Sequence, residues 1–405
     1  MMRPFTKLLS LEDAETIMLK SVRQVERKEE ISIGDVGGRV LAREIVSDMD
    51  VPPFDRSAMD GFAVRAEDTF PAGKFDPVEL RVVGKSLAGH PSGAVVKNEE
   101  CIEIATGAKL PDGVDAIVKV ENTEVTDDTV KIFAPVHPGQ DVSKRGEDIK
   151  AGQSVMKPGA YLDPSNVGVA AALGIEKLSV FERPTVAIVP TGAEVAPPGA
   201  DLQEGQVYDI NTYTLSQVAL LNGCTPRPWG IVLDELEALR KALHEALSED
   251  LVLFSGGSSV GETDILVDIL KERGEILFHG IQVKPGKPTL CGEVDGKLVV
   301  GMPGYPASCL TNAYTLLAPV LRKMARVPPE NERHMDVPIS RRVVSSLGRL
   351  QLLTVRIEEE EAVPVYKESG AITSLADADG YIEIPINTEL VEKGEIVRVK
   401  LFRPV

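Results

Sequence analysis

The sequence of 405 residues lacks the patterns that mark several common kinds of site. Its four cysteines are far apart, form no C-x-x-C pair and have no histidine nearby at zinc-ligand spacing. The five histidines stand singly and form no triad or metal-cluster pattern. We therefore expect structural histidines, and reduced thiols that fill core space. The cysteines are Cys101, Cys224, Cys291 and Cys309.

Long apolar runs and positive charge are also scarce. No stretch approaches the roughly 18 to 20 uncharged apolar residues that cross a bilayer, and the first residues, MMRPFTKLLS, lack the apolar core of a signal peptide. Lysine and arginine number 44 against 62 acidic residues, which gives a net charge of −18. This balance argues against nucleic acid or an anionic membrane as partner, although local lysines can still hold a small anion. We expect a soluble, cytoplasmic protein of several domains.

The first half of the chain predicts two helical segments around a β-rich insertion. A capping serine and apolar residues at helical spacing predict an amphipathic helix over residues 10–25. Short β-rich runs separated by Gly, Pro and Asp predict a small β domain over residues 51–136. An aspartate before a proline, and a glycine at the other end, predict a second helix over residues 163–174. The first region thus resumes after the insertion.

Residues 184–328 alternate between strand and helix patterns, which predicts a mostly parallel sheet covered on both faces. The predicted strands are TVAIV (185–189), GIVL (230–233), LVLF (251–254), one within ILFHGIQV (276–283) and KLVVGM (297–302). The predicted helices cover residues 212–221, 236–247, 265–271 and 307–324. After a linker that contains PPENERH, alternating residues predict a small β domain at the end of the chain.

The unusual residues of this α/β region all follow predicted strand ends, where open α/β sheets bind ligands. The loop SGGSSVGETD (255–264) offers glycine amides and serine hydroxyls before a helix, which suits a phosphate or another oxyanion. Lys284 and Lys287 add positive charge in a stiff turn. Glu194, Asp234 and Asp264 are acids that could position magnesium or polarise water.

Each of these features alone also has a purely structural interpretation. A Gly-Gly-Ser loop is often a tight turn, PGKP a rigid bend and an acid after a strand a helix cap. Their coincidence at one predicted edge favours a site. Upstream, PPFDRSAMDGFAV (52–64) places many polar groups in an apolar run, either because they have partners or because the segment is a surface turn. IATGAKLP (104–111) and SKRGEDIKAG (143–152) are weaker signals, each also readable as a hairpin turn.

Seven motifs, in order along nearly the whole chain, resemble the MoeA-type molybdopterin molybdenumtransferases, the family that includes the E domain of gephyrin. These motifs are PPFDRSAMDGFAV, TGAKLP, KRGEDI, TGAEV, SGGSSVGETD, KPGKP and GMPGYPAS. The resemblance implies a fold of class α/β plus β, in an elongated multidomain subunit. Its implied parts are an N-terminal region of residues 1–46 and 145–183, an inserted β domain of residues 47–144, a molybdopterin-binding-type α/β domain of residues 184–328 and a C-terminal β barrel of residues 329–405.

The resemblance also implies a reaction and its residues. Adenylylated molybdopterin and molybdate or tungstate would be substrates, Mg²⁺ would assist hydrolysis of the phosphoanhydride, and AMP would leave. The implied catalytic acids are Asp60, Asp148, Glu194, Asp234 and Asp264, with Asp234 and Asp264 on magnesium. The implied substrate-binding residues are Thr106, Ser255, Gly256, Gly257, Ser259, Gly261, Lys284, Lys287, Pro303, Gly304, Ser308 and Ser374. Of these, Lys284, Lys287 and Ser308 would hold the oxyanion, and Ser374 would complete that site.

The resemblance further implies a homodimer whose cleft lies between the α/β domain of one subunit and the inserted domain of the other. It suggests the adenylyltransferase that supplies the pterin as a protein partner. The chain departs from the family pattern at Ser258, at Tyr305 and at Thr354, where family members carry a small apolar residue, an asparagine and an arginine; Arg356 lies two positions further on. Two alternatives stay open: a molybdopterin adenylyltransferase, which the extra domains disfavour, and a non-catalytic dimeric scaffold of the gephyrin type, which the retained acids and lysines disfavour.

Overall fold

The computed structural model describes residues 8–256, 265–365 and 371–402, which form two compact units. Unit 1 comprises Met1–Glu30, Gly38–Ala42 and Ser179–Val405, and unit 2 comprises Ile31–Gly37 and Arg43–Leu178. This division is coarser than the four parts that the resemblance implies, whose boundaries stay a prediction. The chain passes from one unit to the other four times: within β1 (Lys28–Ser32), after Gly37, after Ala42 and within β12 (Lys177–Phe181).

Unit 1 contains the expected α/β sheet, with six strands in the order β16-β13-β17-β21-β20-β18. In that order their bounds are Thr225–Pro228, Thr185–Pro190, Leu251–Ser255, Lys297–Met302, Leu290–Val294 and Glu275–His279. The first four strands are parallel, and β20 is antiparallel to both β21 and β18. The prediction of a mostly parallel sheet is therefore confirmed.

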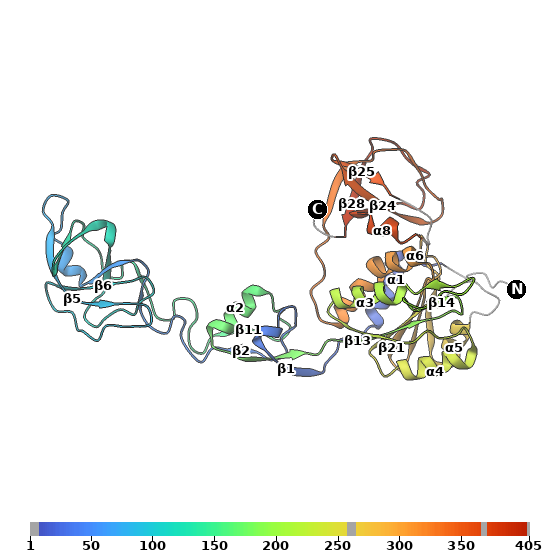
Figure 1. The fold of residues 1–405 in the computed structure, drawn as a ribbon, viewed down its shortest axis with the longest axis horizontal. Helices are drawn as coiled ribbons and strands as arrows, with labels where there is room; N and C mark the ends of the chain where they lie inside the picture. The colour runs from blue at the N-terminus through green and yellow to red at the C-terminus, as the bar shows by residue number, and fades with distance from the viewer. Residues whose placement is uncertain (1–7, 257–264, 366–370, 403–405) are drawn as a thin grey trace. The chain divides into compact units, whose positions relative to one another are not determined.

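Helices cover both faces of this sheet (Figure 1). One face packs against α1 (Leu11–Ser21), α3 (Asn211–Leu221), α6 (Pro306–Asn312) and α7 (Ala318–Met324), and the other against α4 (Leu236–Ala246) and α5 (Ile265–Arg273). Alternate residues of each strand feed the two cores: Val186 and Ile188 face the first, and Ala187 and Val189 face the second. Burial on both sides explains the continuous apolar runs of the central strands.

The predicted strand at residues 230–233 is wrong, because the strand lies earlier, at β16, whose sequence is TPRP. β16 is an edge strand that pairs only with β13. The amides of Thr225 and Trp229 donate to Pro184 and Ile188, and the two prolines alternate with these donors. An edge strand needs hydrogen-bond donors on one side only, so prolines are tolerated at the positions whose nitrogens face outward.

The segment predicted as one strand within residues 276–283 is split. Its first part is β18, while β19 (Val283–Lys284) pairs in parallel with β24 in the C-terminal sheet. Strand β20, which the sequence analysis did not predict, returns antiparallel between β18 and β21. Because β18 and β21 are both antiparallel to β20, they run in the same direction. The connection over residues 280–289 therefore leaves the sheet at the same edge as the loops after β13, β17 and β21.

Two predicted helices differ in detail. The first begins after Ser10, whose Oγ accepts a hydrogen bond from Asp13 N at 3.0 Å, but it ends at Ser21. Val25 is buried outside the helix, where its amide donates to Met324 O at 3.2 Å. The helix predicted over residues 307–324 consists of α6, a π-helical segment (Ala313–Leu317) and α7. Pro319, in the first turn of α7, has no N–H for the regular bond, and the helix widens in the preceding turn.

The end of the chain forms a second sheet in unit 1, in the order β19-β24-β26-β28-β22, with β25 paired to β24. The bounds are Leu350–Glu358 for β24, Gly380–Ile384 for β26, Ile396–Leu401 for β28, His334–Pro338 for β22 and Glu361–Pro364 for β25. A separate pair joins β23 (Val343–Val344) to β27 (Leu390–Val391), and a short helix α8 covers Thr373–Ala376. The sheet has its own apolar core, while Leu375 of α8 packs into the α/β core.

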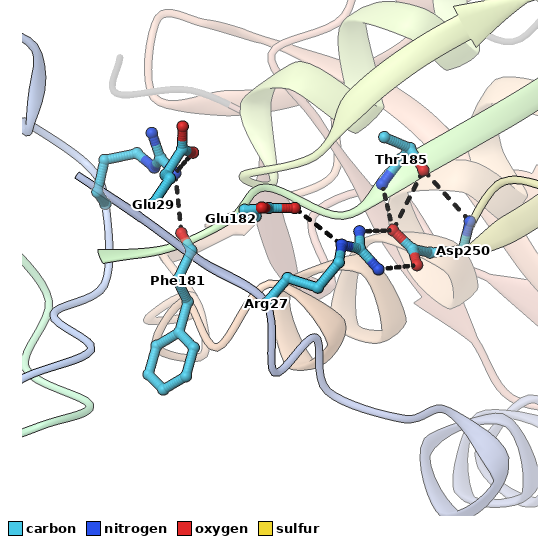
Figure 2. A network of polar contacts seen from close by, with 7 residues as sticks. Arg27, Glu29, Phe181, Glu182, Thr185 and Asp250 are labelled. Carbon is cyan, nitrogen blue, oxygen red and sulfur yellow. Dashed lines mark hydrogen bonds and ion pairs between the residues drawn. The ribbon is translucent and has the colours of Figure 1, made fainter. Parts of the chain in front are cut away.

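The edge at which the strands of the α/β sheet begin is fastened by a network around Arg27 (Figure 2). Its guanidinium donates to both carboxylate oxygens of Asp250, at 2.9 and 2.7 Å, and to Glu182 at 2.8 Å. Asp250 also accepts from the backbone N of Thr185 at 2.8 Å and from its hydroxyl at 3.1 Å. Since Asp250 directly precedes β17 and Thr185 begins β13, one arginine ties the segment before β1 to the starts of two central strands.

Unit 2 contains a six-stranded sheet in the order β7-β4-β6-β5-β9-β8, as expected for a β-rich insertion. The bounds are Ala116–Lys119, Gly61–Val64, Glu100–Ile104, Val78–Ser86, Thr129–Ile132 and Thr123–Thr126. Two short pairs join β3 (Arg56–Ser57) to β10 (Val142–Ser143) and β2 (Ile45–Val46) to β11 (Ser154–Met156). The predicted second helix is α2 (Pro164–Ala172), whose cap Asp163 accepts from Asn166 N at 2.8 Å.

All four cysteines are free and buried, as predicted. Burial raises the pKa of Cys101 to about 12 and raises the pKa values of the other three thiols as well, so these groups stay protonated at neutral pH. Across the described part of the chain, the helices are all too short or too polar to span a membrane.

Candidate functional site

Hydrogen bonds join the loops that follow the strand ends of the α/β sheet. Thr191, directly after β13, donates its amide to Ser255 O at 2.9 Å, and Gly256 donates to Met302 O at 3.3 Å. On the other side, Thr191 forms a β-bridge with Val232. The backbone ladder therefore continues past the ends of β13, β17 and β21, and it holds their loops side by side at one edge.

Gly256 is required at this position by its conformation and by its neighbours. Its φ is +105°, and a Cβ there would lie 2.5 Å from Thr191 O. A Cβ on Gly304, in the loop after β21, would lie 3.6 Å from Gly256 Cα, so these two loops nearly touch. Asn211, at the start of α3, donates to Gly304 O at 2.9 Å. The predicted binding residues Ser255, Gly256, Pro303 and Gly304 thus share one surface built largely of backbone.

Two of the predicted acids, Glu194 and Asp234, lie at the same edge, in the loops that follow β13 and β16. Asp234 is open to solvent on one side, yet the surrounding loops crowd it, and this partial burial raises its pKa. The negative charge of Glu194 raises it further. The Thr191 side chain acts in the opposite direction and lowers the pKa of Asp234, although no hydrogen bond of good geometry reaches Thr191 Oγ1 among the described residues. Two carboxylates thus lie close enough to repel one another.

The predicted lysine pair occupies the connection between β18 and β20. Gly286, between the two lysines, has φ of +106°, and a Cβ there would lie 2.2 Å from the Asn312 side chain. Asn312 donates to Gly286 O at 2.8 Å and to Thr289 Oγ1 at 2.7 Å. The turn that carries Lys284 and Lys287 is therefore held rigidly against α6, as its sequence predicts.

The remaining predicted oxyanion residues lie on two short helices. Ser308 is buried in the first turns of α6, next to the exposed Tyr305 that precedes this helix. Ser374 is buried in α8, and its hydroxyl donates to Ala371 O at 2.8 Å. Thr354, where the sequence analysis expects a departure from the family pattern, is buried on β24, and its hydroxyl has no partner among the described residues.

Part of the predicted site lies outside the described residues. These residues are Gly257, Ser258, Ser259, Gly261 and Asp264. Within the described ranges, no group of three or more His, Cys, Asp or Glu side chains is arranged to hold a metal ion.

In unit 2, the three polar motifs of the first half of the chain lie side by side. Ser57 pairs with Val142 in the β3–β10 ladder and accepts a hydrogen bond from Gly107 N at 2.8 Å. The carboxylate of Asp60 accepts from Thr106 N at 2.8 Å. The structure therefore brings the predicted residues Asp60 and Thr106 into direct contact, and both side chains are exposed.

The polar groups that the DRSAMDG segment places in an apolar run do have partners. Asp55 accepts from Arg145 N at 2.8 Å and from Lys144 Nζ at 2.9 Å. These bonds, led by the backbone bond from Arg145, hold the pKa of Asp55 below its usual value. Asp148 lies three residues further on, exposed, with its amide donating to Val51 O at 3.0 Å. Asp55 is thus structural, whereas Asp60, Thr106 and Asp148 stay accessible.

Sequence reasoning missed several polar side chains around the sheet edge. The oxygen atoms Thr191 Oγ1, Asn211 Oδ1 and Asn312 Oδ1 are buried without a hydrogen-bond partner in the described part of the chain. A buried polar atom with no partner is costly and therefore rare. A signal existed for Asn312, which interrupts an apolar helix in SCLTNAYTLL. None existed for Asn211, because asparagine is common at helix starts.

The six-stranded α/β sheet with its joined loops, the C-terminal sheet and the β-rich unit 2 define a multidomain protein of class α/β plus β. The family description "MoeA N-terminal region (domain I and II)" matches residues 9–174, "Probable molybdopterin binding domain" matches residues 187–323, and "MoeA C-terminal region (domain IV)" matches residues 336–402. The chain belongs to the MoeA family of molybdopterin molybdenumtransferases.

Similar proteins match over nearly the whole length. Solved structures of two molybdopterin biosynthesis MoeA proteins from Pyrococcus horikoshii are 39% and 31% identical to this chain, each with a TM-score of 0.83. Each match covers 98% of this chain and 100% of the other. A molybdopterin molybdenumtransferase from Haemophilus influenzae is 31% identical over 98% of this chain and 99% of its own. The fold class expected from the sequence is therefore confirmed.

Proposed function

We propose that this chain transfers molybdenum to molybdopterin: it binds adenylylated molybdopterin and molybdate, and it hydrolyses the phosphoanhydride so that AMP leaves. Membership of the MoeA family supports this reaction. The observation that carries the proposal is the joined sheet edge, where backbone amides, two acids and a rigid lysine turn occur together. An anionic substrate and a tetrahedral oxyanion need this combination of donors, positive charge and carboxylates.

The roles divide along that edge. Backbone amides and serine hydroxyls would hold the phosphate and pterin, because glycine lets the backbone approach a ligand. The residues that supply them would be Ser255, Gly256, Gly257, Ser259, Gly261 and Gly304. Lys284 and Lys287 would bind the oxyanion with Ser308 and Ser374. The ammonium groups suit a dianion, and the stiff turn keeps them in place at little entropic cost.

Magnesium is an expected cofactor, and Asp234 with Asp264 would hold it beside Glu194. The fit rests on Asp234: crowding and a neighbouring carboxylate raise its pKa, and a bound cation would relieve this excess of negative charge. When bound, the ion would neutralise charge on the phosphoanhydride oxygens. The protein's own part is to hold the carboxylates close together in a fixed position, and the bound ion would favour their ionised form.

We also propose a homodimer in which Asp60, Thr106 and Asp148 of one subunit complete the site at the sheet edge of the other. The exposed cluster of three motifs in unit 2 supports this arrangement, because its acids have solvent-facing positions. Mixing Asp60→Ala with Lys287→Ala subunits should restore about a quarter of the activity, since half of the dimers are mixed and each mixed dimer has one intact site of two. Mixed dimers without activity would instead place each site within one subunit.

The reaction itself is tested by AMP release from adenylylated molybdopterin with magnesium and molybdate. Lys287→Ala and Asp264→Ala should lower the rate by roughly two orders of magnitude or more. Each removes a protein charge that would stabilise the transition state, Lys287 directly and Asp264 through magnesium. Lys241→Ala, on the exposed face of α4, is the matched control and should leave the rate unchanged. Full activity in both site variants would reject the proposed site.

A further inference from the structure

The lysine turn at the sheet edge is bound to the C-terminal β domain as well as to α6. Val283 and Lys284 pair in parallel with Leu350 and Gln351 at the start of β24. Leu350 N donates to Gln282 O at 2.9 Å, and the Gln282 side chain donates to Gly348 O at 3.0 Å. The turn therefore extends the sheet of the C-terminal domain while its ends remain in the α/β sheet.

The Lys284 ammonium is held by this domain. Its Nζ donates to Ser346 Oγ, from the segment that precedes β24. Ser346 is itself fixed, because its amide donates to Gln351 Oε1 at 3.1 Å. The same oxygen accepts from Ser345 Oγ at 3.2 Å, and the Gln351 residue is only 4% exposed. A buried amide thus orients a serine, and the serine orients the lysine.

The chemistry of this partner matters for an anion site. A lysine paired with a carboxylate, such as Lys400 with Glu332 and Glu383, has its charge already neutralised. Ser346 is neutral, and its hydroxyl is the partner that the structure gives to the Lys284 ammonium among the described residues. A free lysine side chain loses up to about 2 kcal/mol of rotamer entropy when it is fixed, and a neutral hydroxyl limits that freedom without cancelling the charge.

We propose that Ser346, oriented by Gln351, is the positioning residue for Lys284, so that the C-terminal domain sets the affinity of the enzyme for its tetrahedral oxyanion. This inference rests on the proposed function, in which Lys284 binds molybdate. Ser346 acts through Lys284. Its loss should therefore weaken oxyanion binding selectively and leave the binding of the adenylylated pterin unchanged.

The test compares Ser346→Ala, Ser346→Thr and Gln351→Leu with the unaltered protein, by direct molybdate binding in equilibrium dialysis and by steady-state AMP release. Ser346→Ala should raise the half-saturating molybdate concentration about tenfold, with less than a twofold change in the rate at saturating molybdate or in KM for the pterin. Gln351→Leu should act in the same direction. Ser346→Thr, which keeps the hydroxyl, should restore affinity, and Ser340→Ala in the same domain is the control.

A double-mutant comparison separates this inference from the proposed function. If Ser346 acts only through Lys284, adding Ser346→Ala to Lys284→Ala should cause no further loss of molybdate affinity. An unchanged affinity in Ser346→Ala, while Lys284→Ala binds molybdate poorly, would overturn the positioning role and leave the proposed site standing. Additive losses would overturn it too. Normal molybdate binding by Lys284→Ala would reject the oxyanion site itself.

Discussion

The two edges of the α/β sheet, where its parallel strands begin and where they end, use similar polar residues in opposite ways. Where β13 and β17 begin, the polar groups saturate one another: burial alone would raise the pKa of Asp250, but hydrogen bonds from Arg27 and Thr185 outweigh it and hold the pKa below its usual value. Where the same strands end, Asp234 has a raised pKa, and the hydroxyl of Thr191 is buried without a full partner. The polar groups of the first edge stabilise the fold. The second edge keeps polar groups without hydrogen-bond partners among the described residues, and a ligand can bind to these groups.

The largest effect should appear in activity at the ligand edge. Asp234→Asn keeps the shape of the side chain but removes its charge, so AMP release should fall by about 100- to 1000-fold, as for other groups that stabilise charge in a transition state. The thermal midpoint should stay the same or rise, because a crowded carboxylate with a raised pKa destabilises the folded state when ionised. Loss of both activity and stability would contradict this division between the edges.

The next effect should appear in stability at the fastened edge. Asp250→Ala leaves Arg27 and the Thr185 amide without their acceptor and should cost about 2–3 kcal/mol, below the range for fully buried pairs because the Arg27 side chain is 51% exposed. Calorimetric unfolding measures this loss. Asp336→Ala breaks a pair of similar geometry with Arg398 on an exposed surface and should have a much smaller effect. AMP release per folded molecule should be unchanged in both variants.

Opposite pH dependences should follow from the two aspartates. The stabilisation from Asp250, whose folded pKa is lowered, is fully present above the unfolded value of about 3.9 and is lost as pH falls through the folded pKa. Asp234 has a raised folded pKa, so its destabilising effect is present at neutral pH and disappears as pH falls through that pKa toward about 3.9. Acid should therefore shrink the stability difference between the unaltered protein and Asp250→Asn.

For Asp234→Asn, lowering the pH should make the unaltered protein more stable relative to the variant. This change should occur at higher pH than the change for Asp250→Asn, because the folded pKa of Asp234 is raised and that of Asp250 is lowered. Unfolding midpoints measured between about pH 2 and about pH 7, without magnesium, give both differences. Parallel pH curves for the two variants would show that burial and hydrogen bonding do not distinguish these edges.

The sequence predicts the ligand edge better than the fastened edge, for a physical reason. Loops that bind through backbone amides need glycine and small polar residues in short continuous motifs, so residues such as Gly256 and the lysine turn stand out locally. The fastening network joins Arg27 to Glu182 and Asp250, which are 155 and 223 residues away along the chain. An arginine, a glutamate and an aspartate at such separations carry no local pattern.

The errors in the predicted fold have a related cause. GIVL has the composition of a strand and TPRP does not, but the edge position of β16 removes the need for donors on one side. β19 was assigned to the wrong sheet because its partner, β24, lies more than 60 residues later. Local composition therefore predicted the presence of a sheet and its loops, whereas strand partners depend on contacts that no local window contains.

The smallest and sharpest test uses one substitution at both ends of β13. Thr185→Val at the fastened edge removes a hydroxyl that donates to Asp250 at 3.1 Å, and should cost about 1 kcal/mol. Thr191→Val at the ligand edge removes a buried hydroxyl that has no hydrogen-bond partner among the described residues; the whole residue is only 3% exposed. Stability should therefore stay equal or rise by up to about 1 kcal/mol. AMP release should fall only in Thr191→Val, since this hydroxyl interacts with Asp234. Equal losses of stability in the two variants would mean that the Thr191 hydroxyl already has a hydrogen-bond partner within the fold. The end of β13 would then offer no unpaired hydroxyl to a ligand.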